Sequence, residues 1–151
     1  MDELDSAIVR ELQTDARQTN RALAGRLGIA PSTCLERVRL LQRRGVIRGY
    51  HADIDPAALN REVEAFISVQ LRPPSRQVIE GFKAAMFARP EVLAVYVVAG
   101  EHDFLVHVSL PSLDGLHSFL IDRLTQRREV LSFRSQIIYD SARKSVHAPL
   151  E

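Results

Sequence analysis

Arginines and short hydroxyl side chains crowd into one stretch of this sequence. Residues 17–50 hold eight arginines against a single acid, Glu36, and so carry a net charge of +7, although the whole chain has a net charge of only +1. Ser32 and Thr33 come just before the segment in which the arginines are most closely spaced. Guanidinium groups bind phosphate oxygens and base edges, and hydroxyl groups bind either. A local basic stretch of this composition indicates contact with a polyanion.

Three short helices are predicted to carry this stretch. Leu4, Ile8 and Leu12 recur every four residues, which predicts an amphipathic helix over residues 3–14. Thr19 is a suitable cap for the second helix, because its hydroxyl oxygen can accept a hydrogen bond from a free backbone N–H.

The connection between the second and third helices is very short. Gly28 is expected to end the second helix, and Pro31 fits the first position of the third, where its missing N–H costs nothing. Gly45 is expected to end the third helix. Two short helices joined by a three-residue turn that contains glycine form a helix-turn-helix.

The third helix has an apolar stripe and an opposite face that is polar and basic. Cys34, Val38 and Leu41 share the stripe, so Cys34 is expected to be a small packed hydrophobe and not a nucleophile or redox sensor. The opposite face has the side chains that a helix needs to enter a DNA major groove. The residues predicted to face the groove are Ser32, Thr33, Glu36, Arg37 and Arg39, and those predicted to hold phosphates are Arg17, Thr19, Arg43 and Arg44.

The second half of the chain alternates between strand and helix patterns. From residue 62 the order is β-α-β-β-α-β, the ferredoxin-like arrangement of four antiparallel strands with two helices on one face. We therefore predict an α+β protein with an N-terminal helix-turn-helix domain of the winged-helix kind. That domain, including a hinge strand over residues 46–54, is expected to span residues 1–54, followed by a junction at 55–61 and the ferredoxin-like domain at 62–151.

One face of the predicted sheet has no helix to cover it. The segment 92–99 is apolar on both sides, so both are expected to be covered. Exposed apolar faces of roughly several hundred Å² usually mark an interface. Self-association is the natural prediction.

Other kinds of chemistry have little support in the sequence. The histidines at 51, 102, 107, 117 and 147 form no metal-binding spacing, and no glycine-rich phosphate loop is present. The single cysteine excludes an internal disulfide, and no apolar run reaches the ~18–20 residues that span a bilayer. We expect no cofactor, no metal ion and no membrane partner. With an N-terminus unlike a secretion signal, these features indicate a cytoplasmic location.

Several segments occur in an order and spacing that match a known family. Cys-Leu-Glu-Arg-Val-Arg spans residues 34–39, Gly-Val-Ile-Arg-Gly-Tyr spans 45–50, and Asp55-Pro56 follows. A Gly-Glu-His-Asp-Phe turn spans 100–104. Over residues 4–143 the chain thereby resembles the leucine-responsive/asparagine-regulator (Lrp/AsnC, feast/famine) transcription regulators.

The resemblance implies both an architecture and an effector. Such proteins join a DNA-binding domain through a hinge strand to a ferredoxin-like domain that dimerises and often assembles further, commonly to octamers. A small molecule, usually an amino acid, binds between effector domains of adjacent dimers and alters assembly or DNA affinity. The candidate effector residues that the resemblance implies are Gly100, Glu101, His102, Asp103 and Phe104 on the turn and Ser135 in the last strand.

The chemistry of the turn agrees with an amino-acid effector. A bare glycine turn offers backbone groups to an α-carboxylate and an α-ammonium, and Asp103 supplies a negative charge for the ammonium. The leading hypothesis is a sequence-specific DNA-binding regulator that responds to such an effector. A ligand-independent architectural DNA-binding protein is the alternative.

An enzyme is the remaining alternative. Some proteins that look like this family are haem-pathway decarboxylases, which need histidines and arginines around a tetrapyrrole. His102 and His107 would point to opposite faces of one strand, which does not suit such a site. We therefore predict that the chain is not an enzyme.

Overall fold

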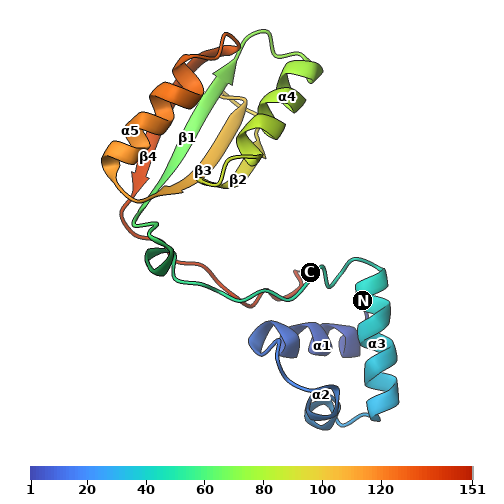
Figure 1. Cartoon of the computed structure of the whole chain (residues 1–151). Coiled ribbons are helices and arrows are strands. Elements are labelled where there is room, and N and C mark those ends of the chain that lie inside the picture. The colour runs from blue at the N-terminus through green and yellow to red at the C-terminus, as the bar shows by residue number, and fades with distance from the viewer. Residues whose placement is uncertain (151) are drawn as a thin grey trace. The chain divides into compact units, whose positions relative to one another are not determined.

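The computed structural model describes residues 1–150, which divide into two compact units (Figure 1). The first unit consists of Met1–Asp53 together with the C-terminal residues from Ala142, and the second consists of Ile54–Ser141. None of the helices described has the length and apolar character needed to cross a membrane.

Three helices make up most of the first unit. The hydroxyl of Thr19 accepts a hydrogen bond from the N–H of Ala22, and Gly28 ends that helix in the left-handed conformation with a φ of 65°. Pro31 opens the third helix, and Gly45 follows its end with a φ of 71°. The predicted helices are confirmed, with bounds α1 Glu3–Thr14, α2 Asn20–Leu27 and α3 Pro31–Arg43.

A small apolar core joins the three helices. Ile8 of α1, Leu23 and Ala24 of α2, and Cys34 and Leu41 of α3 are all buried. Cys34 is completely buried, and this burial raises the pKa of its thiol. A protonated thiol in an apolar core acts as a packing residue, so the prediction for Cys34 is confirmed.

The C-terminal residues return to α1. The side-chain amide of Gln13 donates a hydrogen bond to the carbonyl of His147 at 3.0 Å, and its Oε1 accepts one from the N–H of His147 at 2.8 Å. The amide thus binds both polar groups of one residue's backbone. The first unit is therefore built from two segments whose contacting residues lie 134 positions apart.

The strand predicted over residues 46–54 is not present. The N–H groups of Val46 and Ile47 both donate to the carbonyl of Leu41, so the segment begins as a turn against the end of α3. A strand needs hydrogen bonds to a neighbouring strand, and within residues 1–150 this segment takes part in no ladder. Tyr50 and Ile54 remain exposed. The prediction of a hinge strand was wrong for the single chain because apolar alternation does not supply the partner.

The second unit is a four-stranded antiparallel sheet in the order β2-β3-β1-β4 with two helices, which confirms the ferredoxin-like prediction. A capped turn of 3-10 helix, η1, precedes it, with Asp55 accepting a hydrogen bond from the N–H of Ala57. The bounds are η1 Pro56–Leu59, β1 Val63–Leu71, α4 Arg76–Phe87, β2 Val92–Val97, β3 Phe104–Leu110, α5 Leu113–Leu120, the π-helical turn η2 Ile121–Thr125 and β4 Val130–Ile138.

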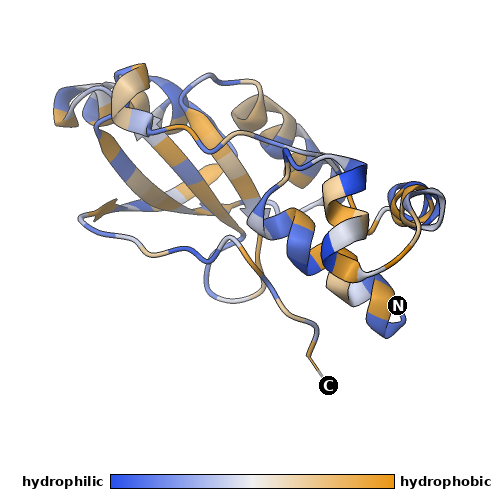
Figure 2. Ribbon diagram, turned by 90° about the horizontal axis from the view of Figure 1, so that it is seen from below, coloured by the Kyte–Doolittle hydropathy of each residue, from blue (hydrophilic) through white to orange (hydrophobic). Residues whose placement is uncertain are grey.

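Alternate residues of the strands face the two helices. Ile67, Val69 and Val106 are buried there against Phe82 and Met86 of α4. The residues between them lie on the opposite face of the sheet, which we call the open face because neither helix packs on it. The hydropathy alternation along the strands is visible in Figure 2.

The open face is mixed in character. Tyr96 of β2 pairs in register with Leu105 of β3, and Tyr96 is 49% exposed. His107 lies beside them, with its Nε2 2.7 Å from a carboxylate oxygen of Glu64 and its ring stacked on Phe66 at a centroid distance of 4.7 Å. The face therefore combines exposed apolar surface with a polar pair of which His107 is buried and Glu64 is partly exposed.

Candidate nucleic-acid interface and effector turn

Side chains on the outer face of α3 line an open hollow of about 470 Å³. Three arginines contribute to its lining, and one acid, Glu36, lies among them. The apolar stripe of Cys34 and Leu41 packs inward and so fixes which face of the helix looks outward. The lining residues are Thr33, Glu36, Arg37, Arg39, Leu40 and Arg43.

Most of the predicted DNA-binding residues of α3 are exposed. This holds for Ser32, Thr33, Glu36, Arg39, Arg43 and Arg44. Charged and hydroxyl side chains on one exposed helical face can contact phosphates and base edges together. The structure thus brings these six residues together on the exposed surface of α3 and at its C-terminal end.

Thr19 and Arg17, the two predicted phosphate-binding residues that precede α3, differ in their hydrogen bonds. Thr19 caps α2 with its hydroxyl, so that oxygen already accepts the N–H of Ala22. The backbone N–H of Arg17 donates to Asp15, while its side chain is exposed. Asn20 donates from its amide to the carbonyl of Pro31 at 2.8 Å and so ties the start of α2 to the start of α3.

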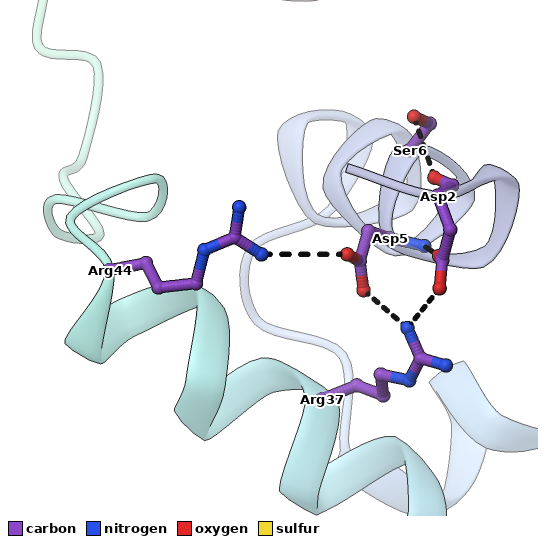
Figure 3. A network of polar contacts seen from close by, with 5 residues as sticks. All are labelled: Asp2, Asp5, Ser6, Arg37 and Arg44. Atoms are coloured by element: carbon purple, nitrogen blue, oxygen red, sulfur yellow. Dashed lines mark hydrogen bonds and ion pairs between the residues drawn. The ribbon is translucent and has the colours of Figure 1, made fainter.

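Arg37 differs from its neighbours because it is half-buried in a network of ion pairs (Figure 3). Its Nη1 donates to Oδ1 of Asp5 at 3.0 Å and also to Oδ2 of Asp2. Nη1 of Arg44 lies 3.9 Å from Oδ2 of the same Asp5. A hydrogen bond from the backbone N–H of Asp5 and one from Arg37 lower the pKa of Asp2. Arg37 of α3 and Arg44, which follows the end of α3, therefore both form ion pairs with acids at the start of α1.

The sequence analysis did not predict the two acids that form ion pairs with Arg37. Asp2 and Asp5 could be explained as acids in the first turn of a helix, where the dipole favours negative charge. Asp5, however, is three and seven residues before Ile8 and Leu12, so it lies on the apolar stripe of α1. An acid on a buried stripe calls for a cationic partner, so the sequence could have predicted an ion pair for Asp5, although not that Arg37 forms it.

The turn between β2 and β3 is fastened to the end of β1 by Asp103. Oδ2 of Asp103 accepts a hydrogen bond from the N–H of Leu71 at 2.7 Å, and its own N–H donates to the carbonyl of Val69 at 3.0 Å. Gly100 has a φ of 148°, which L-residues rarely adopt. The turn is thus held in a defined conformation and is not a loose loop.

The candidate effector residues do not all meet in one chain. Glu101 is exposed and His102 and Asp103 are half-buried beside Gly100. The ring of Phe104 is completely buried in the core, 4.8 Å from the ring of Phe82, so only its backbone belongs to the turn.

Ser135 lies on the other side of β1 from this turn. It is exposed on β4 and pairs in register with Ile67, whereas Phe104 at the end of the turn pairs with Val69 from the β3 side. Strand β1 therefore separates Ser135 from the turn.

Replacing Gly100 with alanine tests how much of the turn depends on its conformation. A Cβ would meet no atom within 4 Å, so the cost is backbone strain alone. We expect Gly100→Ala to lower the free energy of unfolding by about 1–3 kcal/mol in urea denaturation. Gly81→Ala is the control, since Gly81 lies in α4 with open space around it, and it should be neutral or stabilising. Equal effects of the two substitutions would contradict the prediction.

Comparison with protein families assigns each unit. Residues 1–48 match the winged helix-turn-helix DNA-binding profile, and residues 64–146 match the Lrp/AsnC ligand binding domain profile. The second match spans more than half of the chain.

The chain belongs to the Lrp/AsnC family.

Known Lrp/AsnC proteins resemble it over nearly their whole length. The HTH-type transcriptional regulator AldR of Mycolicibacterium smegmatis is 42% identical over 143 residues, which are 95% of this chain and 84% of AldR. The leucine-responsive regulatory protein of Escherichia coli K12 is 31% identical, over 96% of this chain and 88% of that protein. A crystal structure of a Neisseria meningitidis transcriptional regulator in complex with L-Met superposes with a TM-score of 0.90 at 30% identity, covering 99% of this chain and 96% of that one.

Membership of the Lrp/AsnC family decides between the functional classes. The chain is a DNA-binding transcription regulator with a ligand-binding domain, as the two profile matches show. Its relatives are regulators and not enzymes. The prediction that the chain is not an enzyme is confirmed, and the decarboxylase alternative is set aside.

Proposed function

We propose that α3 enters the major groove of a specific DNA site. The exposed face of α3 carries this proposal, because Arg39 and Arg43 border its hollow without an ion pair to any residue from 1 to 150. Arginine forks recognise guanine edges and bind phosphates. In this proposal Ser32, Thr33, Glu36, Arg37 and Arg39 face the bases, and Arg17, Thr19, Arg43 and Arg44 hold the backbone.

Selection from a random pool of DNA duplexes tests this function directly. The purified chain is expected to enrich a sequence motif, and repeating the selection with a mixture of amino acids is expected to change the yield or the motif. Recovery of unrelated sequences in every round would count against specific recognition. We also propose that this protein binds its DNA in the cytoplasm.

We propose that the chain dimerises through the open face of the sheet. Tyr96 and its neighbour Leu105 offer apolar surface there, and the side chains of Glu64 and His107 are already partnered with each other at 2.7 Å. A dimer places two copies of α3 on half-sites ~34 Å apart, one turn of DNA. Assembly of dimers into octamers, which the family resemblance implies, is part of the same proposal.

A charge on the open face is expected to break the dimer. Tyr96→Glu should raise the dimer dissociation constant about 30-fold or more, because aromatic residues at the centre of an interface commonly contribute ~2 kcal/mol. Sedimentation at several protein concentrations measures the shift. Phe87→Glu is the matched control, since Phe87 is 70% exposed on α4, away from the open face. Unchanged association of a folded Tyr96→Glu protein would contradict the proposed interface.

We propose that the effector is an amino acid bound at the turn of Gly100, Glu101, His102, Asp103 and Phe104. Oδ1 of Asp103 has no hydrogen-bond partner within residues 1–150 and can receive an α-ammonium, while the glycine backbone leaves room for an α-carboxylate. The relative crystallised with L-Met supports the ligand class. Because β1 separates Ser135 from the turn, a ligand that touches both is proposed to lie between two subunits.

Calorimetry with the twenty amino acids separates this proposal from the architectural alternative. The protein must be in its associated form during the titration, since the proposed site needs two subunits. At least one amino acid is expected to bind and to change DNA affinity or particle size. If none binds and none alters assembly, the chain acts on DNA without this class of effector.

A further inference from the structure

We infer that Asp5 is a positioning residue for DNA recognition, because it holds Arg37 of α3 in a fixed direction at the edge of the hollow that the helix presents to DNA. The inference rests on the proposed DNA-binding face of α3. It adds residues of α1, which makes no proposed DNA contact, to the determinants of sequence preference.

The carboxylate of Asp5 is fixed by the fold. Its side chain is only 6% exposed, although it carries a charge. Its two oxygens are used separately, with Oδ1 accepting from Arg37 and Oδ2 facing Arg44. A buried carboxylate requires such partners, since its desolvation is costly when it is unpaired. Asp5 therefore cannot follow Arg37 if the arginine moves away, and it sets where the arginine lies.

Asp2 is the second acceptor for the guanidinium of Arg37. Its Oδ1 accepts the N–H of Asp5 at 2.8 Å and thereby caps α1, while its Oδ2 accepts from Arg37. Figure 3 shows both carboxylates meeting the same terminal nitrogen of the guanidinium. Since the group is planar and rigid, fixing one nitrogen between two acceptors fixes the direction of the others.

The remaining donors of Arg37 are free to recognise DNA. Its Nε and Nη2 have no hydrogen-bond partner among residues 1–150, and the side chain is 34% exposed. Arg37 also lines the hollow on the outer face of α3 together with Thr33, Glu36 and Arg39. A side chain that is already ordered loses less conformational entropy on binding than a free one. The network thus leaves part of the arginine fork available and points it in one direction.

Simple charge repulsion makes the opposite prediction. If Asp2 and Asp5 only repelled phosphates, removing one charge would strengthen binding to every DNA sequence. A positioning role instead predicts that binding to the specific site weakens while binding to unrelated DNA stays constant or strengthens. The ratio of the two affinities separates these roles, and a purely structural role that lowers the amount of folded protein lowers both affinities together.

The test compares Asp5→Asn with Glu3→Gln in the 151-residue chain. The probes are an operator duplex selected by the unchanged protein and a scrambled duplex of the same length and composition. Asp5→Asn is expected to lower the ratio of specific to non-specific affinity about tenfold, a part of what a bidentate arginine contact contributes. Glu3→Gln removes the same charge from the same helical turn, where Glu3 is exposed and forms no ion pair with residues 1–150, and should leave the ratio unchanged.

A double substitution shows whether Asp5 acts through Arg37. Arg37→Gln alone is expected to lower the ratio, and Asp5→Asn added to it should lower the ratio no further. Full additivity of the two losses, or an unchanged ratio for Asp5→Asn, overturns the inference. Arg43→Gln is measured beside them and must weaken binding to both duplexes. If it does not, the proposed DNA face of α3 fails, whereas failure of Asp5→Asn alone leaves that face intact.

Asp2→Asn keeps the test decisive if Asp5→Asn does not fold. Asp2 is 52% exposed, so its substitution removes one of the two acceptors without emptying a buried site. The expected loss in the affinity ratio is then about threefold, with circular dichroism showing an intact fold. An unfolded Asp5→Asn protein together with an unchanged ratio for Asp2→Asn also overturns the inference.

Discussion

Replacing Arg39 and Arg43 together by glutamine is expected to weaken binding to the selected operator by about 100-fold. A well-placed arginine contact with a base contributes ~1–3 kcal/mol of discrimination, and a phosphate contact adds to affinity on any sequence. Both side chains lie on the exposed face of α3, so their loss should leave the fold intact. Fluorescence anisotropy with a labelled duplex measures the change.

The salt dependence of DNA binding shows how much of the lost affinity comes from each of the two arginines. Each phosphate contact removed should reduce the slope of log affinity against log salt by ~0.9, so Arg43→Gln alone is expected to flatten the slope by about that amount. Arg39→Gln should change the slope less and relax the sequence preference more. A double substitution of Arg76 and Arg128, which are exposed on the second unit, lowers the net charge equally and serves as the control. If both double variants lose the same affinity, the loss reflects net charge and not the face of α3.

Replacing Phe104 with alanine is expected to lower the free energy of unfolding by about 3–5 kcal/mol. Its ring is completely buried at the start of β3, against Phe82 of α4, and truncation leaves a cavity between sheet and helix. Urea denaturation measures the change in stability. Phe87→Ala is the control, because Phe87 is 70% exposed and should change stability by about 0.5 kcal/mol or less.

The Phe104 experiment also separates packing from ligand contact. If the ring belongs to the core, Phe104→Leu should retain most of the stability and the same effector preference. A stable Phe104→Leu protein that loses effector binding would show that the ring itself contacts the ligand. The buried position of the ring leads us to expect the first result.

The local structure of this chain is largely predictable because it depends on residues close together in sequence. Thr19, Gly28 and Pro31 mark helix ends through their own hydrogen-bonding capacity and backbone preferences, and each performs that role. The strands of the second unit follow from alternation, since every second residue of β1 from Ala65 to Leu71 is buried.

The wrong strand prediction and the missed ion pairs of Arg37 both involve a partner distant in sequence. Val46 to Ile54 has the composition of a strand, but a strand also needs another strand beside it. Arg37 has the type and helical position of a base contact, yet its nearest partners are acids more than thirty residues earlier. Periodicity cannot supply information of this kind, because it describes one segment at a time.

The contact between Gln13 and His147 has a consequence for the order in which the molecule forms. During synthesis, α1, α2 and α3 leave the ribosome long before His147 is made, and domains generally fold as they emerge. Closing a loop of 134 residues has an entropic cost that local helix packing does not have. The helices therefore reach their packed arrangement first, and the C-terminal segment attaches only after the sheet has been synthesised. Protection of the His147 amide from hydrogen exchange thus reports the attachment of the C-terminal segment to α1.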